Sequence, residues 1–217
     1  MRCIRSEQQQ GGIYMKTNSQ LRKEKTLFLT QNAVLAAIVV LMAFTPLGYL
    51  RTGTGIEITF IMIPVAVGAI TLGEKSGAFL GLVFGISSFI QCFGMSAFGA
   101  ALLQINPIFT FIMCLVPRIL MGYLCGVIYK ALKKVKRGVA IFIASLSAPV
   151  LNTLLFVGLL ILLFGRTDFI TEMRAGANLF AFLIAFVGFN GILEIIATTL
   201  ISPPVAMTVE KAVKKFR

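Results

Sequence analysis

The sequence predicts an all-α fold: an integral membrane bundle of six transmembrane helices with its N and C termini in the cytoplasm. Three observations predict it. Of the 217 residues, 58% are hydrophobic and 13% charged, with a mean hydropathy of +0.92, whereas soluble domains carry about 25% charged residues. The apolar residues form consecutive runs close to the ~20 residues that cross a bilayer. The basic residues gather on the segments that six crossings leave on one side.

Six apolar runs are the expected crossings, at residues 27–48, 56–73, 77–95, 107–129, 139–164 and 177–204. Together they form one membrane domain over residues 27–205. A polar tail at residues 1–26 precedes it and is expected to be disordered, and a basic cytoplasmic tail at residues 206–217 follows it. Met15 is the expected natural start, so that residues 1–14 are an upstream extension.

Turn and helix-end residues support these boundaries. The polar stretch from Gly73 to Gly77 predicts a tight turn that joins the second and third runs as a hairpin. Pro107 suits the first position of the fourth helix. The pair Pro203 and Pro204 is expected to end the sixth helix, because proline removes a backbone hydrogen bond.

The basic residues predict the orientation. Sixteen of the 20 Lys and Arg residues fall on one side, in the N-terminal tail, at Lys75, in the linker 130–138 and in the C-terminal tail, against three on the other side at Arg51, Arg166 and Arg174. Cytoplasmic segments carry such an excess. We therefore attribute the net charge of +12 to topology and expect a lipid bilayer rather than a nucleic acid as the partner.

Several function classes are excluded. The chain has no histidine, which removes histidine-dependent intramembrane proteases, haem ligation and histidine proton relays. Its four cysteines, Cys3, Cys92, Cys114 and Cys125, lack metal-ligand spacing and predict neither a zinc site nor a disulfide framework. No poised acid and base pair is present for catalysis. We expect neither an enzyme nor a cofactor, and a stand-alone channel or facilitator for a small solute remains an alternative.

Small residues four apart predict close helix approach. They occur as Ala33-x-x-x-Ala37, Gly77-x-x-x-Gly81-x-x-x-Gly85 and Gly122-x-x-x-Gly126. Both glycine motifs are expected to pack inside the bundle. For the alanine pair, docking of an external partner is a competing interpretation.

Polar residues at membrane depth are rare and usually functional. Arg118, Asn152, Asn190 and Glu194 lie on the last three predicted helices at similar depth. Two alternatives are open for Arg118: an internal ion pair with Glu194, or contact with a ligand. The two asparagines are either binding residues or glue between helices.

The outer half of the bundle holds more ligand-type groups, namely Glu57, Thr59, Gln91, Gln104 and Asn106. The connection at residues 96–106 is uncharged and of mixed apolar character, which predicts a lid over a cavity or an interfacial re-entrant segment. The candidate substrate-binding residues are therefore Arg118, Asn106, Asn152, Asn190, Gln91, Gln104, Glu57 and Glu194.

Five motifs, in order along residues 30–205, resemble those of the substrate-binding S components of energy-coupling factor (ECF) vitamin transporters. They are the A-x-x-x-A pair at Ala33, the LGEKSGAFLGLVFG hairpin at 72–85, LVPRILMG at 115–122, Asn152-Thr153, and FNGILE at 189–194. The pantothenate-type subgroup is the most similar. Two departures near the expected pocket, Gly188-Phe189 and Ser147 to Leu151, leave the vitamin open.

The resemblance implies a mechanism and partners. The chain would bind a pantothenate-like vitamin from outside the cell, in a cavity capped by the outer connections, and deliver it inward. It would dock on a transmembrane coupling subunit through Ala33 and Ala37, and two ATPase subunits would drive the release. The resemblance implies a multi-pass protein of the plasma membrane, and it does not say whether the coupling module is shared.

Overall fold

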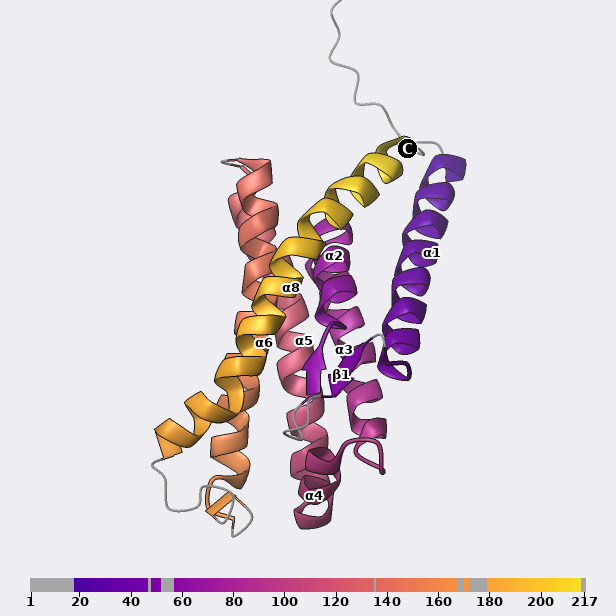
Figure 1. Ribbon diagram of the computed structural model, residues 1–217. Helices are drawn as coiled ribbons and strands as arrows, with labels where there is room; N and C mark the ends of the chain where they lie inside the picture. Colours follow the sequence, from indigo (N-terminus) through magenta and orange to yellow (C-terminus); the bar gives the residue numbers. More distant parts are fainter. Residues whose placement is uncertain are drawn as a thin grey trace, which may run out of the picture.

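The computed structural model describes residues 18–46, 48–51, 57–134, 136–167, 170–171 and 179–215. Long helices run side by side, with one small β-hairpin between them (Figure 1). The elements are α1 (Asn18–Ala43), β1 (Tyr49–Arg51), β2 (Glu57–Thr59), α2 (Met62–Leu72), α3 (Glu74–Gln91), α4 (Ala97–Ile105), α5 (Pro107–Leu132), α6 (Arg137–Phe164) and α8 (Leu179–Lys215).

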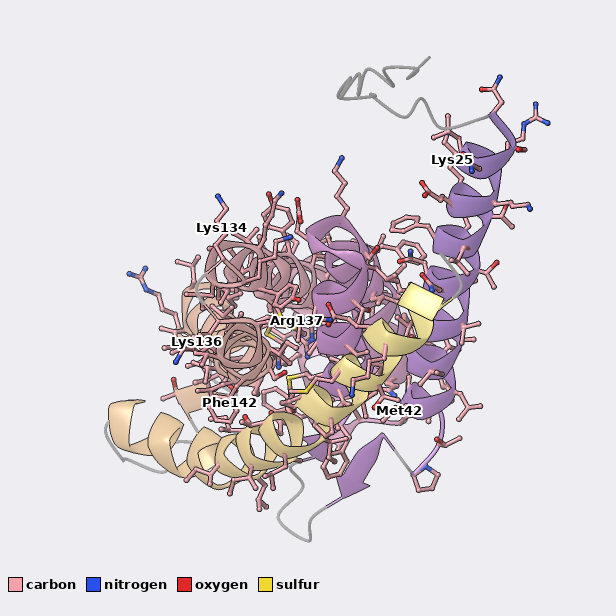
Figure 2. All side chains as sticks on the ribbon, turned by 90° about the horizontal axis from the view of Figure 1, so that it is seen from above. Lys25, Met42, Lys134, Lys136, Arg137 and Phe142 are labelled. Carbon is pink, nitrogen blue, oxygen red and sulfur yellow. The ribbon has the colours of Figure 1, made fainter. Side chains whose placement is uncertain are left out.

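The start of α1, the α2–α3 turn, the α5–α6 linker and the end of α8 lie at one end of the bundle, which we call the basic end (Figure 1). An ion pair of 2.7 Å joins Lys130 at the end of α5 to Glu74 at the start of α3. Figure 2 looks down on this end, where Lys134 and Lys136 extend away from the helices. The charge clusters that the sequence assigns to one side are therefore together in space. Helix α4 lies at the opposite end, which we call the α4 end.

Four described helices are long and apolar enough to cross a membrane: α1, α5, α6 and residues Gly191–Lys211 of α8. The apolar helix α2 has 11 residues, or about 16 Å at 1.5 Å per residue, about half of a bilayer core of ~30 Å. Helix α3 has 18 residues and carries Glu74 and Lys75 at its start. The chain is thus a helical bundle with several membrane-crossing helices.

Helix α1 begins at Asn18, so the prediction of disorder is wrong for residues 18–26. This stretch is rich in Gln, Leu, Arg, Lys and Glu, which favour helices, and it extends the helix beyond the apolar run. The hydroxyl of Thr26 donates to the carbonyl oxygen of Arg22 at 3.0 Å, within the same helix. Residues 1–17, with the proposed start at Met15, lie outside the described residues.

The hairpin of β1 and β2 was not predicted. The strands pair antiparallel with Tyr49 opposite Thr59 and Arg51 opposite Glu57. The apolar run at residues 56–73 predicts one helical crossing, but β2 occupies its first part and α2 begins only at Met62. Hydropathy does not distinguish a short buried strand from a helix, and β-branched Ile58 and Thr59 favour the strand.

Glycines set the distance between α3 and α5. A Cβ atom on Gly77 would overlap the carbonyl oxygen of Gly122, and one on Gly122 would overlap that of Gly77. One turn on, a Cβ atom on Gly81 would overlap the carbonyl oxygen of Arg118. The prediction that both glycine motifs pack inside the bundle is confirmed. Gly73, with φ of +105°, makes the predicted turn between α2 and α3.

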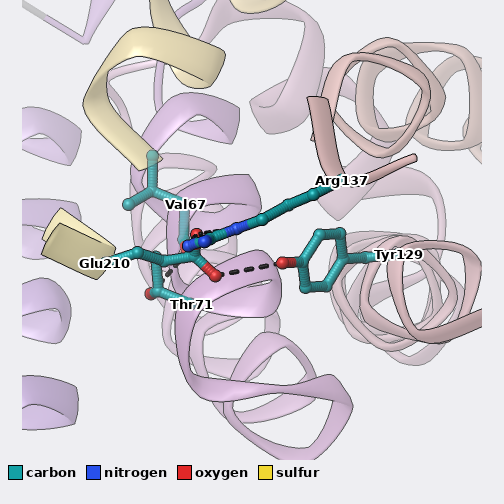
Figure 3. Close-up of polar contacts among 5 residues, drawn as sticks. All are labelled: Val67, Thr71, Tyr129, Arg137 and Glu210. Atoms are coloured by element: carbon teal, nitrogen blue, oxygen red, sulfur yellow. Dashed lines mark hydrogen bonds and ion pairs between the residues drawn. The ribbon is translucent and has the colours of Figure 1, made fainter. Parts of the chain in front are cut away.

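Helix α8 does not end at Pro203 and Pro204, as predicted, but continues to Lys215. The two prolines remove only the hydrogen bonds that their own N–H groups would donate one turn back. Contacts beyond them hold the helix: Ala206 is fully buried, and Glu210 joins α8 to α5 and α6. Its carboxylate accepts a hydrogen bond of 3.0 Å from the Tyr129 hydroxyl and forms an ion pair with Arg137 (Figure 3).

Candidate binding site

Two separate apolar clusters leave a polar layer between them. The larger cluster, toward the basic end, includes Leu80, Phe84, Met121 and Ala148. The smaller one, at the α4 end, is built from Leu102, Met113, Leu160, Phe164 and Ile170. On α5, Arg118 falls between Met113 of one cluster and Met121 of the other. Asn152 falls between Ala148 and Leu160 on α6, so both helices place a polar residue in the layer.

The guanidinium of Arg118 is held by a carbonyl and two aromatic rings. One terminal nitrogen donates to the carbonyl oxygen of Met113 at 2.8 Å. The guanidinium carbon lies 5.5 Å from the ring centre of Phe84 on α3 and 5.0 Å from that of Phe156 on α6. Both distances are within the ~6 Å range of a cation–π interaction. Arg118 therefore ties three helices together, and within the described part of the chain no carboxylate forms an ion pair with it.

Two polar atoms of the layer lack a partner within the described part of the chain. They are Nε of Arg118 and Oδ1 of Asn152, both buried. Nε can only donate a hydrogen bond and Oδ1 can only accept one. Leaving such a group unpaired costs about 1–3 kcal/mol. The layer thus holds one unpaired donor and one unpaired acceptor.

Glu194 does not pair with Arg118. Its carboxylate accepts a hydrogen bond of 2.8 Å from the backbone N–H of Thr59, where β2 ends. Ion pairs within 4.0 Å join Lys130 to Glu74 and Arg137 to Glu210, and neither pair includes Arg118 or Glu194. Of the two alternatives for Arg118, the ion pair with Glu194 is not formed. Glu194 instead fixes the hairpin to α8.

Two other predicted residues are engaged with the backbone. The side-chain nitrogen of buried Gln91 donates to the carbonyl oxygen of Ala43, which joins the ends of α3 and α1. The side-chain oxygen of Asn106 caps α5 by accepting from the N–H groups of Ile108 and Phe109, both at 3.1 Å. These contacts give both residues a structural role.

Three candidate binding residues remain: Gln104, Glu57 and Asn190. Gln104 is exposed on α4. The side chains of Glu57 and Asn190 lie outside the described residues. The connection expected to be a lid is a helix, α4, which begins after Ser96, whose hydroxyl accepts from the N–H of Gly99 at 3.3 Å. Its Leu102 packs in the cluster at the α4 end.

Ala33 and Ala37 lie on an exposed side of α1. The helix packs on the bundle through Asn32, Val39 and Ala43. Of the residues in its most apolar stretch, only 17% are buried. The corresponding part of α6 is equally exposed, so lipid contact alone would explain such exposure. On α1 a pair of small residues four apart is exposed, whereas Ala140, Ala144 and Ala148 of α6 are buried; an exposed pair lets a further helix approach closely.

Sequence reasoning missed the aromatic partners of Arg118. Phe84 is almost fully buried and lies one residue before Gly85 of the glycine motif. Its place beside a packing glycine is the sequence feature that could have indicated a buried ring. Phe156 lies four residues after Asn152, which places both on one face of α6. Among the described residues, no three His, Cys, Asp or Glu side chains gather as a metal site requires.

Comparison with known proteins assigns the family. The family described as "ECF transporter, substrate-specific component" matches residues 27–206. A pantothenate transporter, PanT, from Leuconostoc mesenteroides is 33% identical over 188 residues, which cover 81% of this chain and 88% of the relative. A pantothenic acid transporter, PanT, from Lactococcus lactis is 28% identical over 203 residues, covering 88% of this chain and 98% of the relative.

These matches span nearly the whole helical bundle, and they agree with its apolar, membrane-crossing helices. The chain is a multi-pass protein of the plasma membrane, and its relatives are transporters rather than enzymes. It belongs to the family of ECF transporter substrate-specific components.

Proposed function

We propose that this chain is the vitamin-binding subunit of an ECF-type ATP-dependent importer and that its ligand is pantothenate or a related B vitamin with a carboxylate. The vitamin enters from the α4 end and binds in the polar layer between the two apolar clusters. Arg118 binds the carboxylate, and Asn152 accepts a hydrogen bond from a hydroxyl or amide group. The names of the two relatives, both pantothenate transporters, support this ligand class.

The observation that carries the proposal is the environment of Arg118. A charged residue at membrane depth costs about 2.5–3.5 kcal/mol or more on insertion, and its usual compensation is a carboxylate. Here the guanidinium lies between Phe84 and Phe156, and its buried Nε has no partner within the described structure. A ligand carboxylate would supply the missing anion and accept from the planar donor fork of the guanidinium.

The aromatic rings also give the arginine its position. Rings from α3 and α6 on the guanidinium restrict the rotamers of a long side chain, so that less entropy is lost when a ligand binds. Arginine suits this role better than lysine, because its planar group stacks on rings and still presents several N–H donors at its edge. The same rings exclude water from the pair and strengthen it.

For the topology we propose six crossings, by α1, α2 with the hairpin, α3, α5, α6 and α8. Both termini and the basic end then face the cytoplasm, as the excess of Lys and Arg there requires. Helix α2 is short, and the hairpin that precedes it extends that pass toward the α4 end. The polar layer is then reached from the outside.

For transport we propose that the exposed side of α1 docks on a transmembrane coupling subunit. Ala33 and Ala37 allow the close approach, and Val34 and Leu41, which are 54% and 58% exposed, add apolar contact beside them. Two cytoplasmic ATPase subunits supply the energy.

The experiment that tests the function is uptake of radiolabelled pantothenate by cells that lack their own importer. We expect uptake only when this chain is produced together with a coupling subunit and both ATPases, and loss of uptake when the catalytic residues of the ATPases are replaced. Uptake by this chain alone would contradict the proposal and favour a stand-alone facilitator. Mass spectrometry of molecules released from the purified protein identifies the bound vitamin in the same preparation.

A further inference from the structure

Two cysteines from different elements meet at the α4 end of the bundle. Cys92 follows directly on α3, and Cys114 lies in the second turn of α5. Their sulfur atoms are 3.8 Å apart, and both residues are only 4% exposed. Both are free thiols, and 21 residues, including all of α4, separate them along the chain.

The surroundings hold the two thiols against each other. Gly99 of α4 lies over Cys92, where a Cβ atom on the glycine would come within 2.6 Å of the sulfur. Cys92 also lies 3.4 Å from the carbonyl oxygen of Ser88, one turn back in α3. A third free thiol, Cys125, donates instead to the carbonyl oxygen of Ala144 at 3.2 Å. The Cys92–Cys114 contact is therefore a specific pairing of two thiols, and Cys125 offers a control in the same helix.

We propose that Cys92 and Cys114 are a disulfide-forming pair, which a peroxide oxidises to link the end of α3 to α5. An S–S bond is about 2.05 Å long, so the sulfur atoms must approach by about 1.8 Å, which rotation about the side-chain bonds can provide. The partners come from two helices whose spacing the glycines Gly77, Gly81 and Gly122 already fix. The bond would form without rearrangement of the bundle.

The chemistry balances with a peroxide as the two-electron oxidant. One cysteine, as the thiolate, attacks the peroxide oxygen, the O–O bond breaks, and the products are a sulfenic acid and one molecule of alcohol or water. The thiolate of the second cysteine then attacks the sulfenic sulfur, the S–O bond breaks, and a molecule of water leaves. Two thiols are oxidised to one disulfide, and one peroxide is reduced. Hydrogen peroxide is small enough to reach thiols with little exposed surface.

The crosslink would restrain α4 and stabilise the α4 end of the protein. Because Cys92 and Cys114 stand on either side of α4 in the chain, the disulfide closes a loop that contains the whole helix. Closing a loop reduces the freedom of the unfolded chain and stabilises the native state. Oxidation should therefore hold α4 against the ends of α3 and α5 and raise the temperature at which this end of the protein unfolds.

Peptide mapping by mass spectrometry tests the proposal on the full-length protein in detergent or nanodiscs. The protein is treated with hydrogen peroxide, its remaining thiols are alkylated under denaturing conditions, and it is digested without reductant. We expect one crosslinked peptide that contains Cys92 and Cys114, a mass loss of two hydrogens, and full alkylation of Cys125. Reduction by a phosphine should restore two alkylation sites.

The variants C92S, C114S and C125S complete the test. We expect C125S to form the crosslink as the wild type does and to show the same rise in unfolding temperature on oxidation. C92S and C114S should show neither. The proposal is overturned if Cys92 and Cys114 both remain alkylatable after oxidation, if they are oxidised separately to sulfinic acids, or if either pairs with Cys3 or Cys125 instead. The wild-type peptide map alone decides this even if a variant fails to fold.

Discussion

The carboxylate of Glu194, buried on α8, accepts a hydrogen bond of 2.8 Å from the backbone N–H of Thr59 at the end of β2. This bond attaches the hairpin to α8, and its two residues lie 135 positions apart in the chain. The hairpin in turn leads directly into α2. Glu194 is thus an anchor for the backbone of the hairpin.

Variants of Glu194 show whether this residue acts through its hydrogen bond to Thr59 or through its negative charge. Glu194→Gln keeps an oxygen that can accept from Thr59, so we expect the stability to stay near that of the wild type. Glu194→Ala leaves the partly buried N–H group of Thr59 unpaired, which should cost about 1–3 kcal/mol. Thermal unfolding in detergent measures both. If Glu194→Gln destabilises the protein as strongly as Glu194→Ala, the negative charge itself is required and the anchor role is wrong.

Packing of α3 on α5 predicts a strong position dependence for glycine substitutions. Gly122→Ala places a methyl group against the backbone of Gly77, and we expect a loss of about 1–3 kcal/mol from overpacking. Gly158→Ala on α6 is the matched control, because a Cβ atom there meets nothing within 4 Å. Thermal unfolding and yield of the folded protein should separate the two. Equal effects would mean that the two helices do not pack as described.

The cluster at the basic end predicts how the last part of α8 is held. Tyr129→Phe removes one hydrogen bond to Glu210, which should lower the stability by about 0.5–1.5 kcal/mol. Glu210→Ala also breaks the ion pair with Arg137 and should cost more than Tyr129→Phe. Hydrogen exchange of the backbone beyond Pro204 should increase in both variants. Unchanged exchange there would contradict the account of why the helix continues through its prolines.

The proposed docking side of α1 predicts a difference between neighbouring positions. Ala33→Phe should abolish ATP-dependent uptake while pantothenate binding to the isolated subunit stays intact, because a bulky side chain prevents close helix approach. Ile38→Phe adds bulk at a position that is 41% exposed and faces another side of α1, and it should leave uptake largely unchanged. Loss of binding together with uptake in Ala33→Phe would indicate internal packing instead.

Sequence reasoning was most successful where one physical effect dominates. Small residues four apart predicted that both glycine motifs pack inside the bundle, because a missing side chain lets two backbones come close, and the structure places them at the α3–α5 contact. The turn at Gly73 and the helix start at Pro107 were predicted from backbone restrictions that apply whatever the neighbours are.

The failures have a common cause, which is that tertiary contacts outweigh local preference. Pro203 and Pro204 did not end α8, because Glu210 and Ala206 hold the helix beyond them. The strand at Glu57–Thr59 was assigned to a helix, because its apolar character says nothing about its hydrogen bonding. The contact between Gln91 and the carbonyl oxygen of Ala43 was not predicted either, because only the folded chain brings these two residues together. The binding role of Gln91 and Asn106 stays a prediction.

The central claim is that Arg118 binds a carboxylate of the vitamin, and one set of binding measurements tests it most directly. Isothermal titration compares pantothenate with its alcohol analogue, in which CH2OH replaces the carboxylate, on the wild type and on Arg118→Met. We expect the wild type to prefer the acid by more than about tenfold, the equivalent of ~1.4 kcal/mol, and Arg118→Met to lose that preference while it still binds the alcohol. An undiminished preference for the acid in Arg118→Met would contradict the account.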